Sequence, residues 1–343
     1  MLERWTDLVV RRSLAIIVLC LSFFLERGLH ADSTIKVKVG VLMPFTGDFA
    51  YTGDTARKAI LAATRFRHID FAFEDSACDA RKSLSGYRKL REVDNVRLFL
   101  GPCCGNELES IAPLLEKNDA LVMSLCSSTG ELFKRSHGRI MSPVFSIEAE
   151  SRFNAMNLEL EGYRNLAIVY FDNAFSVAHE VAFRGALVKA RALTYKFDKV
   201  DPEAVRDIAT KLRKNPPDAI YVPDLTPFML SFSRQLRNLG LGSVPIFSIH
   251  VVQTELLLNA EGHSADGIIY SHPDIGPESA DTYYAARAAR FVEDAVAKCK
   301  NSVSCVKQHL LDHNSFAEDG TMQGVLVLKT VKNGEFVPFI KAH

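Results

Sequence analysis

Glycine, hydroxyl and thiol residues follow two apolar runs between residues 98 and 131, where they could bind a small anion. Residues 98–100 (LFL) stop at Gly101-Pro102, and residues 121–123 (LVM) stop at a polar series made of Ser124, Cys126, Ser127, Ser128 and Thr129. If both runs are parallel strands, their carboxyl ends lie side by side. Hydroxyls and the N–H groups of helix starts at such an edge favour an anionic ligand. Alternatively, both are ordinary strand-to-helix turns in which Ser and Thr cap a helix.

The elements that must position these turns alternate between strands and helices. Apolar and β-branched runs predict strands at residues 36–43, 71–73, 98–100, 121–123, 166–170, 192–197, 219–222 and 245–249, with an extended run at 267–270. Helical spacing predicts helices at residues 56–63, 79–90, 108–115, 177–190, 202–213, 227–239 and 279–298. Asp201 is the expected cap of the helix that begins at Pro202. Residues 45–54 and 171–176 are predicted turns, and Asn333-Gly334 predicts a terminal hairpin. This order predicts an α/β fold with parallel sheets, and residues 141–148 predict a change of domain.

Composition excludes several classes of function. The 343 residues are enough for two domains, and 48% hydrophobic with 24% charged residues is typical of a globular protein. The formal net charge is zero and there is no basic run, which argues against a nucleic-acid partner. The adjacent Cys103-Cys104 suit no common zinc spacing, and no Cys-x-x-Cys is present. We therefore expect neither a metal site nor a cofactor.

Residues 1–31 are expected to form a signal peptide. Arg11-Arg12 precede an apolar run at residues 14–25, and Leu29-His30-Ala31 offers a cleavage site before Asp32. An uncleaved N-terminal anchor is the alternative interpretation. Export predicts a periplasmic protein, and the six cysteines of the mature chain then favour disulfides.

The order of short motifs resembles that of the periplasmic branched-chain amino-acid-binding proteins. The resembling segments are residues 39–47 (VGVLMPFTG), 74–79 (EDSACD), 101–104 (GPCC), 124–128 (SLCSS), 170–176 (YFDNAFS), 217–219 (PDA), 234–237 (RQLR) and 239–241 (LGL). The resemblance spans roughly residues 35–341. It implies two Rossmann-like lobes joined by three crossing segments, with a small solute held in the cleft between them. It also implies hinge closure and delivery to an ABC permease of the inner membrane, and we expect a monomer.

The same resemblance implies lobe limits and disulfides. The expected N-terminal lobe comprises residues 32–146 with 252–312, and the C-terminal lobe residues 147–251 with 313–343. Members of the family carry a disulfide at the positions of Cys78 and Cys104. Cys299 and Cys305 lie in a polar stretch, expected to be a loop, and suggest a second, local disulfide. Cys103 and Cys126 are then expected to be buried small hydrophobic residues.

The candidate ligand-binding residues are Tyr51, Gly105, Asn106, Cys126, Ser127, Ser128, Phe175, Asp224 and His250. The resemblance implies roles for Gly105, Cys126, Ser128, Phe175 and His250, whereas Tyr51 is a candidate because the turn after the first strand could wall the pocket. Gly105 stands where the family has a serine, so that turn offers backbone N–H groups without a hydroxyl. Phe175 stands where the family often has a tyrosine. His250 aligns with the acid that pairs the ammonium of an amino acid, and Asp224 is an alternative acid.

These departures leave the ligand open. A neutral histidine cannot replace a full negative charge opposite an ammonium. A branched-chain amino acid, a small carboxylate without an amine, an aromatic acid and an amide-like solute are therefore all candidates. Other interpretations exist for several candidates. His250 is then a satisfied histidine outside the cleft, and Phe175 packs in the core. Ser127 and Thr129 cap a helix, and Tyr51 with Phe49 lies in an exposed loop.

Three functions compete. The first is a solute-binding component of an ABC importer, without catalysis. The second is a ligand-sensing domain of the same fold. The third is a hydrolase that uses Cys103 or Cys104, against which stands the absence of Gly-x-Ser-x-Gly, His-Glu-x-x-His and Walker patterns.

Overall fold

The computed structural model describes residues 36–65, 68–126, 128–198, 201–224, 226–261, 264–274, 278–314, 316–318, 320–322 and 324–340. The predicted signal peptide and Ser127 lie outside these residues. Within the described ranges, no helix is long and apolar enough to cross a bilayer.

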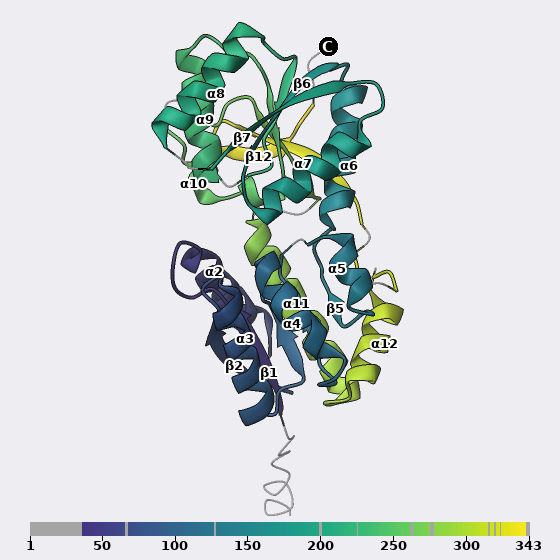
Figure 1. Cartoon of the computed structure of the whole chain (residues 1–343). Coiled ribbons are helices and arrows are strands. Elements are labelled where there is room, and N and C mark those ends of the chain that lie inside the picture. Colours follow the sequence, from purple (N-terminus) through teal and green to yellow (C-terminus); the bar gives the residue numbers. More distant parts are fainter. Residues whose placement is uncertain are drawn as a thin grey trace, which may run out of the picture. The chain divides into compact units, whose positions relative to one another are not determined.

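The first lobe is built on a parallel sheet of five strands in the order β2-β1-β3-β4-β5 (Figure 1). The strands are β1 (Val37–Met43), β2 (Ile69–Asp75), β3 (Leu98–Leu100), β4 (Leu121–Met123) and β5 (Ile140–Met141). Successive side chains point to opposite faces, so Leu98 and Leu100 join one core cluster while Phe99 joins the other. Because both faces are covered, the central strands β3 and β4 are apolar throughout rather than alternating.

Helices cover both faces of this sheet. One face carries α2 (Ala50–Ala63), α11 (Ala280–Cys299) and α12 (Val303–His313). The other carries α3 (Ala80–Arg88) with its π-helical extension η1 (Lys89–Val93), α4 (Gly105–Leu115) and α5 (Gly130–Arg135). The helix α2 begins six residues earlier than the predicted start at residue 56, so Tyr51 lies in its first turn and not in a loop.

The second lobe is built on a mixed sheet of seven strands in the order β12-β11-β10-β9-β8-β6-β7. The strands are β6 (Asn165–Phe171), β7 (Arg191–Phe197), β8 (Ala219–Tyr221), β9 (Ile246–Ser248), β10 (Ile268–Pro273), β11 (Leu326–Lys332) and β12 (Glu335–Pro338). The last two form the predicted hairpin, whose turn residues Asn333 and Gly334 both have positive φ, 54° and 73°.

Helices again cover both faces of the second sheet. One face carries α6 (Ile147–Leu160) and α7 (Ala174–Ala186). The other carries α8 (Pro202–Lys214), α9 (Thr226–Asn238) and α10 (Glu255–Leu258), and a 3-10 turn η2 (His250–Val252) follows β9. The predicted cap of α8 is present, because the Asp201 carboxylate accepts a hydrogen bond from Ala204 N at 2.8 Å.

The chain passes between the sheets three times within the described residues, each time at the carboxyl ends of parallel strands. It leaves the first sheet after β5 and enters α6, whose first amide, Ile147 N, donates to Ser128 O at 3.1 Å. It returns from the end of β10 to the start of α11. It crosses again into β11, whose first residue, Leu326, pairs with Pro273 at that same end of β10. Since every crossing joins one carboxyl edge to the other, the two edges face each other.

Sheet membership corrects the expected lobe limits. Residues 252–273 contain α10 and β10, and β10 pairs with β9 of the second sheet, so the second lobe continues beyond residue 251 to Pro273. Phe316 and Met322 form a bridge and join the core of the first lobe, which therefore extends beyond residue 312. Strand periodicity could not reveal either limit, because it says nothing about which sheet a strand joins.

Three disulfides tie the first lobe. Cys78–Cys104 and Cys299–Cys305 pair as expected, although Cys305 lies in α12 and not in a loop. Cys103 and Cys126 form a third disulfide, with Cα atoms 4.9 Å apart, so the expectation that both are free, buried hydrophobic residues was wrong. The adjacent Cys103 and Cys104 thus link the turn after β3 to the turn after β4, the neighbouring strand, and to the turn after β2, which lies beyond β1 in the sheet.

A buried polar cluster joins α6 to the ends of β9 and β10 in the second lobe. The Glu150 carboxylate accepts hydrogen bonds from His250 N (2.9 Å) and Ser271 Oγ (2.7 Å) and lies 2.8 Å from His250 Nδ1. Asn154 donates to Ser271 Oγ at 2.9 Å. Burial opposes ionisation, but His250 holds the pKa of Glu150 at about 2. Burial likewise lowers the pKa of His250, yet Glu150 raises it above its ordinary value.

Replacement of both Cys103 and Cys126 by Ala is expected to lower the free energy of unfolding by about 3 kcal/mol, because their disulfide spans 23 residues. The matched Cys299→Ala/Cys305→Ala variant opens a span of only 6 residues and should lose about 2 kcal/mol. Urea unfolding of the oxidised mature chain measures both losses. Two reactive thiols in that chain after denaturation would contradict the third disulfide.

The variant Glu150→Gln is expected to lose about 3 kcal/mol of stability, because it leaves a buried histidine without its counter-charge. The contribution of Glu150 is complete above its unfolded pKa of about 4.3 and is lost as the pH falls towards 2. The contribution of His250 is complete below about pH 6.5 and is lost as the pH rises through its raised pKa. The loss should therefore be greatest between about pH 4.5 and 6.5.

Urea unfolding between pH 3 and 9 measures this profile. The matched control is Glu203→Gln on the exposed side of α8, which should change stability by less than about 0.5 kcal/mol at every pH. A loss for Glu150→Gln that does not vary with pH would show that packing, and not the ion pair, is responsible.

Candidate functional site

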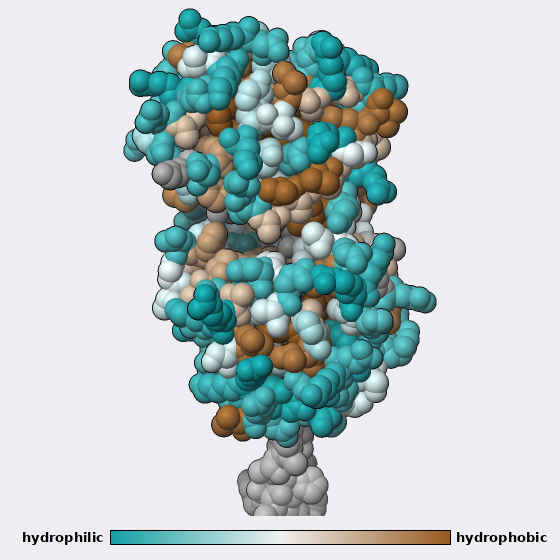
Figure 2. Space-filling view, in the orientation of Figure 1, coloured by the Kyte–Doolittle hydropathy of each residue, from teal (hydrophilic) through white to brown (hydrophobic). Residues whose placement is uncertain are grey.

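The facing carboxyl edges bring most of the predicted ligand-binding residues to one region. The first lobe contributes the first turns of α2 and α4 and the turn after β4; the second contributes the first turn of α7 and the residues after β8 and β9. Figure 2 shows a hollow between the two lobes on the face it displays. Such an edge is where α/β sheets bind small ligands.

The start of α4 is the best candidate for binding an anion in the first lobe. Gly105 and Asn106 provide the first amides of the helix, and the first N–H groups of a helix have no carbonyl partner within it. A Cβ built on Gly105 would meet no heavy atom within 4 Å, so the space of a side chain is open there. Asn106 is held by its Nδ2, which donates to Cys78 O at 3.1 Å. The turn therefore offers backbone donors rather than a hydroxyl.

Glu107 and the disulfides fix the shape of this turn. The buried Glu107 accepts a hydrogen bond from Cys104 N at 3.0 Å, which closes the start of α4. Burial raises the pKa of Glu107 above its ordinary value. Cys78–Cys104 and Cys103–Cys126 hold the same turn from either side. The amides of Gly105 and Asn106 are thus in place before any ligand arrives.

The turn after β4 has two roles. Cys126 O accepts hydrogen bonds from Ser124 Oγ (3.1 Å) and Ser142 Oγ (3.4 Å), and Ser128 is buried with its carbonyl bound to the start of α6. Thr129 caps α5 by accepting from Leu132 N at 3.4 Å, as the capping interpretation predicts. This turn therefore connects the candidate site to the first crossing segment.

The second lobe contributes aromatic and acidic groups. Phe175 lies in the first turn of α7, partly buried against the core, with its ring edge-on to His179 at 4.8 Å. Asp224 follows β8 and is only 6% exposed. The ring of Phe175 therefore packs on the core, as the core interpretation predicts, and its contact with a solute stays a prediction.

His250 is occupied by a partner within the protein. Its ring nitrogen and its backbone N–H both contact Glu150, which leaves the imidazole buried and charge-paired. This agrees with the interpretation of His250 as a satisfied histidine. Nothing in the local sequence indicated Glu150 as its partner, because the two residues are 100 positions apart.

Asp281 is a residue of this region that the sequence did not single out. It lies in the first turn of α11, where it was predicted only as part of a helix, and it is half-buried. Burial raises its pKa to about 6. Burial also raises the pKa of Tyr51, and the charge of Asp281 adds to that rise. Tyr51 itself is 49% exposed.

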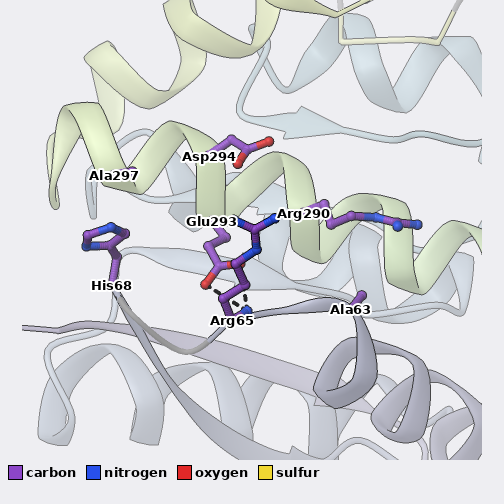
Figure 3. Close-up of a pocket in the computed structure, with 7 residues that line it drawn as sticks. All are labelled: Ala63, Arg65, His68, Arg290, Glu293, Asp294 and Ala297. Atoms are coloured by element: carbon purple, nitrogen blue, oxygen red, sulfur yellow. Dashed lines mark hydrogen bonds between the residues drawn. The ribbon is translucent and has the colours of Figure 1, made fainter.

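A separate pocket of about 440 Å³ lies at the other end of α2 and α11, away from the carboxyl edge (Figure 3). Arg65 N donates to both carboxylate oxygens of Glu293 there, at 3.1 and 3.0 Å. The contact ties the segment after α2 to the second half of α11. The described residues hold no group of three or more His, Cys, Asp or Glu side chains arranged to bind a metal ion.

Comparison with solved structures identifies the fold. The leucine-binding protein LivK of Thermotoga maritima superposes with a TM-score of 0.78 at 17% identity, over 89% of this chain and 98% of LivK. A solute-binding protein of an ABC transporter from R. palustris, in complex with benzoate, gives 0.77 at 15% identity, over 88% and 95%. LivJ of Streptococcus pneumoniae, in complex with isoleucine, gives 0.76 at 16% identity, over 88% and 97%.

At the level of sequence, no curated protein matches the chain. The family of periplasmic binding proteins matches it over residues 36–304. This match covers most of the chain, and the two lobes with three crossings are those of the type I members of that family. The chain therefore belongs to the type I periplasmic binding protein family, whose members bind solutes.

Proposed function

We propose that this protein is the exported solute-binding component of an ABC importer, and that it captures a small amino-acid-like or carboxylate solute between its lobes. The observation that carries the proposal is the pre-shaped start of α4 at the facing edges, with amides of Gly105 and Asn106 free of helical carbonyl partners. A binding protein needs such donors in place because ordering them upon binding would cost affinity.

A carboxylate is the group that this turn fits best. Helix-start amides and the helix dipole favour a negative charge. The solutes named for three structural neighbours are leucine, benzoate and isoleucine, and all three carry a carboxylate although their other ends differ. We infer that the solute of this protein shares that group and places it against Gly105 and Ser128.

The second lobe would cover the remainder of the solute. Phe175 offers an aromatic surface at the facing edge, and Tyr51 offers another from α2. Closure about the three crossing segments would bury the solute and present a joint surface of both lobes to a membrane permease. We propose a periplasmic monomer, delivered there by the signal peptide of residues 1–31.

A thermal-shift screen of the mature protein tests this function. Branched-chain and aromatic amino acids, benzoates, short carboxylates and amides are the probes, and a ligand at about 100 times its Kd adds about 2.7 kcal/mol of stability. At least one carboxylate solute should raise the melting temperature. Failure of every probe, together with turnover of an ester or amide substrate, would overturn the proposal.

The variant Gly105→Ser is expected to bind a carboxylate solute about 5- to 10-fold more tightly, because the open space at Gly105 admits a hydroxyl donor. The control is Gly185→Ser at the end of α7, where a Cβ also meets no atom within 4 Å but no solute is expected. Calorimetric titration compares both variants with the wild type. Equal affinities for all three proteins would place the carboxylate elsewhere.

A further inference from the structure

The proposed function accounts for the anionic end of the solute, and the structure also contains a group suited to a cationic end. We propose that the Asp281 carboxylate, on α11 of the first lobe, binds a positively charged nitrogen of the solute. The inference rests on the proposed function and narrows it, since the solute would carry an amine as well as a carboxylate.

Asp281 lies at the carboxyl edge of the first sheet. The helix α11 packs along α2. Their first turns lie together, since the charge of Asp281 acts on Tyr51, and Arg65, just after α2, contacts Glu293 further along α11 (Figure 3). Next to Asp281, the Gln253 Nε2 atom donates to Glu278 O at 2.7 Å, which ties the start of α11 to the segment after β9. The His250 ring of the second lobe also lies edge-on to Tyr284, one turn further along α11, at 6.0 Å, so Asp281 lies where the two lobes meet.

The carboxylate of Asp281 does not cap α11, and its position in the first turn gives it only the favourable interaction of an acid with the helix start. Ser279 already caps α11, its hydroxyl accepting from Thr282 N at 3.3 Å. Among the described residues, none donates a hydrogen bond to Asp281 and none forms an ion pair with it. A half-buried acid without donors costs free energy in the unliganded protein, and such groups gather at functional sites.

In the described part of the chain, no free positive charge nearby balances the carboxylate of Asp281. His250 is the nearest cationic group, but its charge is balanced by Glu150 at 2.8 Å. The other titratable groups that face this region are the phenols of Tyr51 and Tyr284, whose pKa values burial raises, so both are neutral. Neither tyrosine therefore supplies a positive charge to Asp281, and the charge of His250 is already paired. An ammonium would compensate the charge of Asp281 and would supply the hydrogen-bond donors that this carboxylate lacks.

This arrangement differs from the one that the family resemblance implied. There the acid opposite the ammonium was expected at position 250, in the second lobe. Here that position is a histidine in an internal ion pair, and the free acid stands on α11 of the first lobe. With the negative charge at Asp281 instead of position 250, a zwitterionic solute could bind although position 250 is a histidine.

Matched solutes with and without an amine test the inference. The pairs are leucine with 4-methylpentanoate, phenylalanine with 3-phenylpropanoate, and 4-(aminomethyl)benzoate with 4-methylbenzoate. In at least one pair, the wild type should bind the solute that carries the amine 10-fold or more tightly than the solute that lacks it. Asp281→Asn should remove that preference by weakening the amine alone, and Asp294→Asn, an exposed acid on the same helix, should leave it unchanged.

The outcomes separate this inference from the proposed function. If acids bind and amines gain nothing, or if Asp281→Asn keeps the preference, Asp281 does not bind the solute and the proposed function stands. If no carboxylate of either kind binds, the proposed function fails and this inference fails with it. The comparison of solutes on the wild type requires no variant to fold.

Stability and pH give two further readouts. Burial raises the pKa of Asp281 to about 6, so its ionised form destabilises the unliganded protein above that pH. Asp281→Asn should therefore raise the melting temperature at pH 7.5, whereas an acid that merely supports the helix start would lower it on removal. Affinity for the amine should fall as the pH drops from 7.5 to 5, and the variant should lose that dependence. A lower melting temperature for the variant and a flat profile for the wild type would overturn the inference.

Discussion

The structure depends on a constraint of chain direction. Strands β1 to β5 are parallel, as are the neighbouring strands β6 to β10, and all three crossings join the sheets at the carboxyl ends of these strands. The starts of the helices that follow the strands then point towards the opposite lobe, and their unpaired amides gather in one place. The candidate site is a consequence of this topology before any particular side chain is considered.

Covalent and ionic links then fix the two edges by different means. In the first lobe, Cys78–Cys104 and Cys103–Cys126 hold together the turns that follow β2, β3 and β4. In the second lobe, the buried pair of Glu150 and His250 holds the start of α6 to the end of β9. Buried ion pairs contribute little net stability but are costly to break, so this pair selects one arrangement of the crossing.

The sequence predicts features that depend on adjacent residues, but it does not predict contacts between residues far apart in the chain. The hairpin at Asn333-Gly334 and the start of α8 at Asp201 depend on a few adjacent residues, and both were predicted. The Cys103–Cys126 disulfide, the Glu150–His250 pair and the membership of β10 in the second sheet depend on tertiary placement, which periodicity does not encode. Most candidate site residues followed from the family resemblance, whereas Asp281 became visible only once α11 was placed beside α2.

The proposed solute contacts divide unequally between the lobes. Both of its charged ends would face the first lobe, with the carboxylate at the start of α4 and the amine at Asp281, while the charges of Glu150 and His250 in the second lobe cancel each other. The first lobe alone would then orient the solute, because it would bind both the carboxylate and the amine. The second lobe would add mainly apolar contact through Phe175. The strength of such contact depends on the buried apolar area and not on the orientation of the groups. Closure would therefore exclude water from charge contacts that have already formed, and would strengthen them by lowering the local dielectric constant.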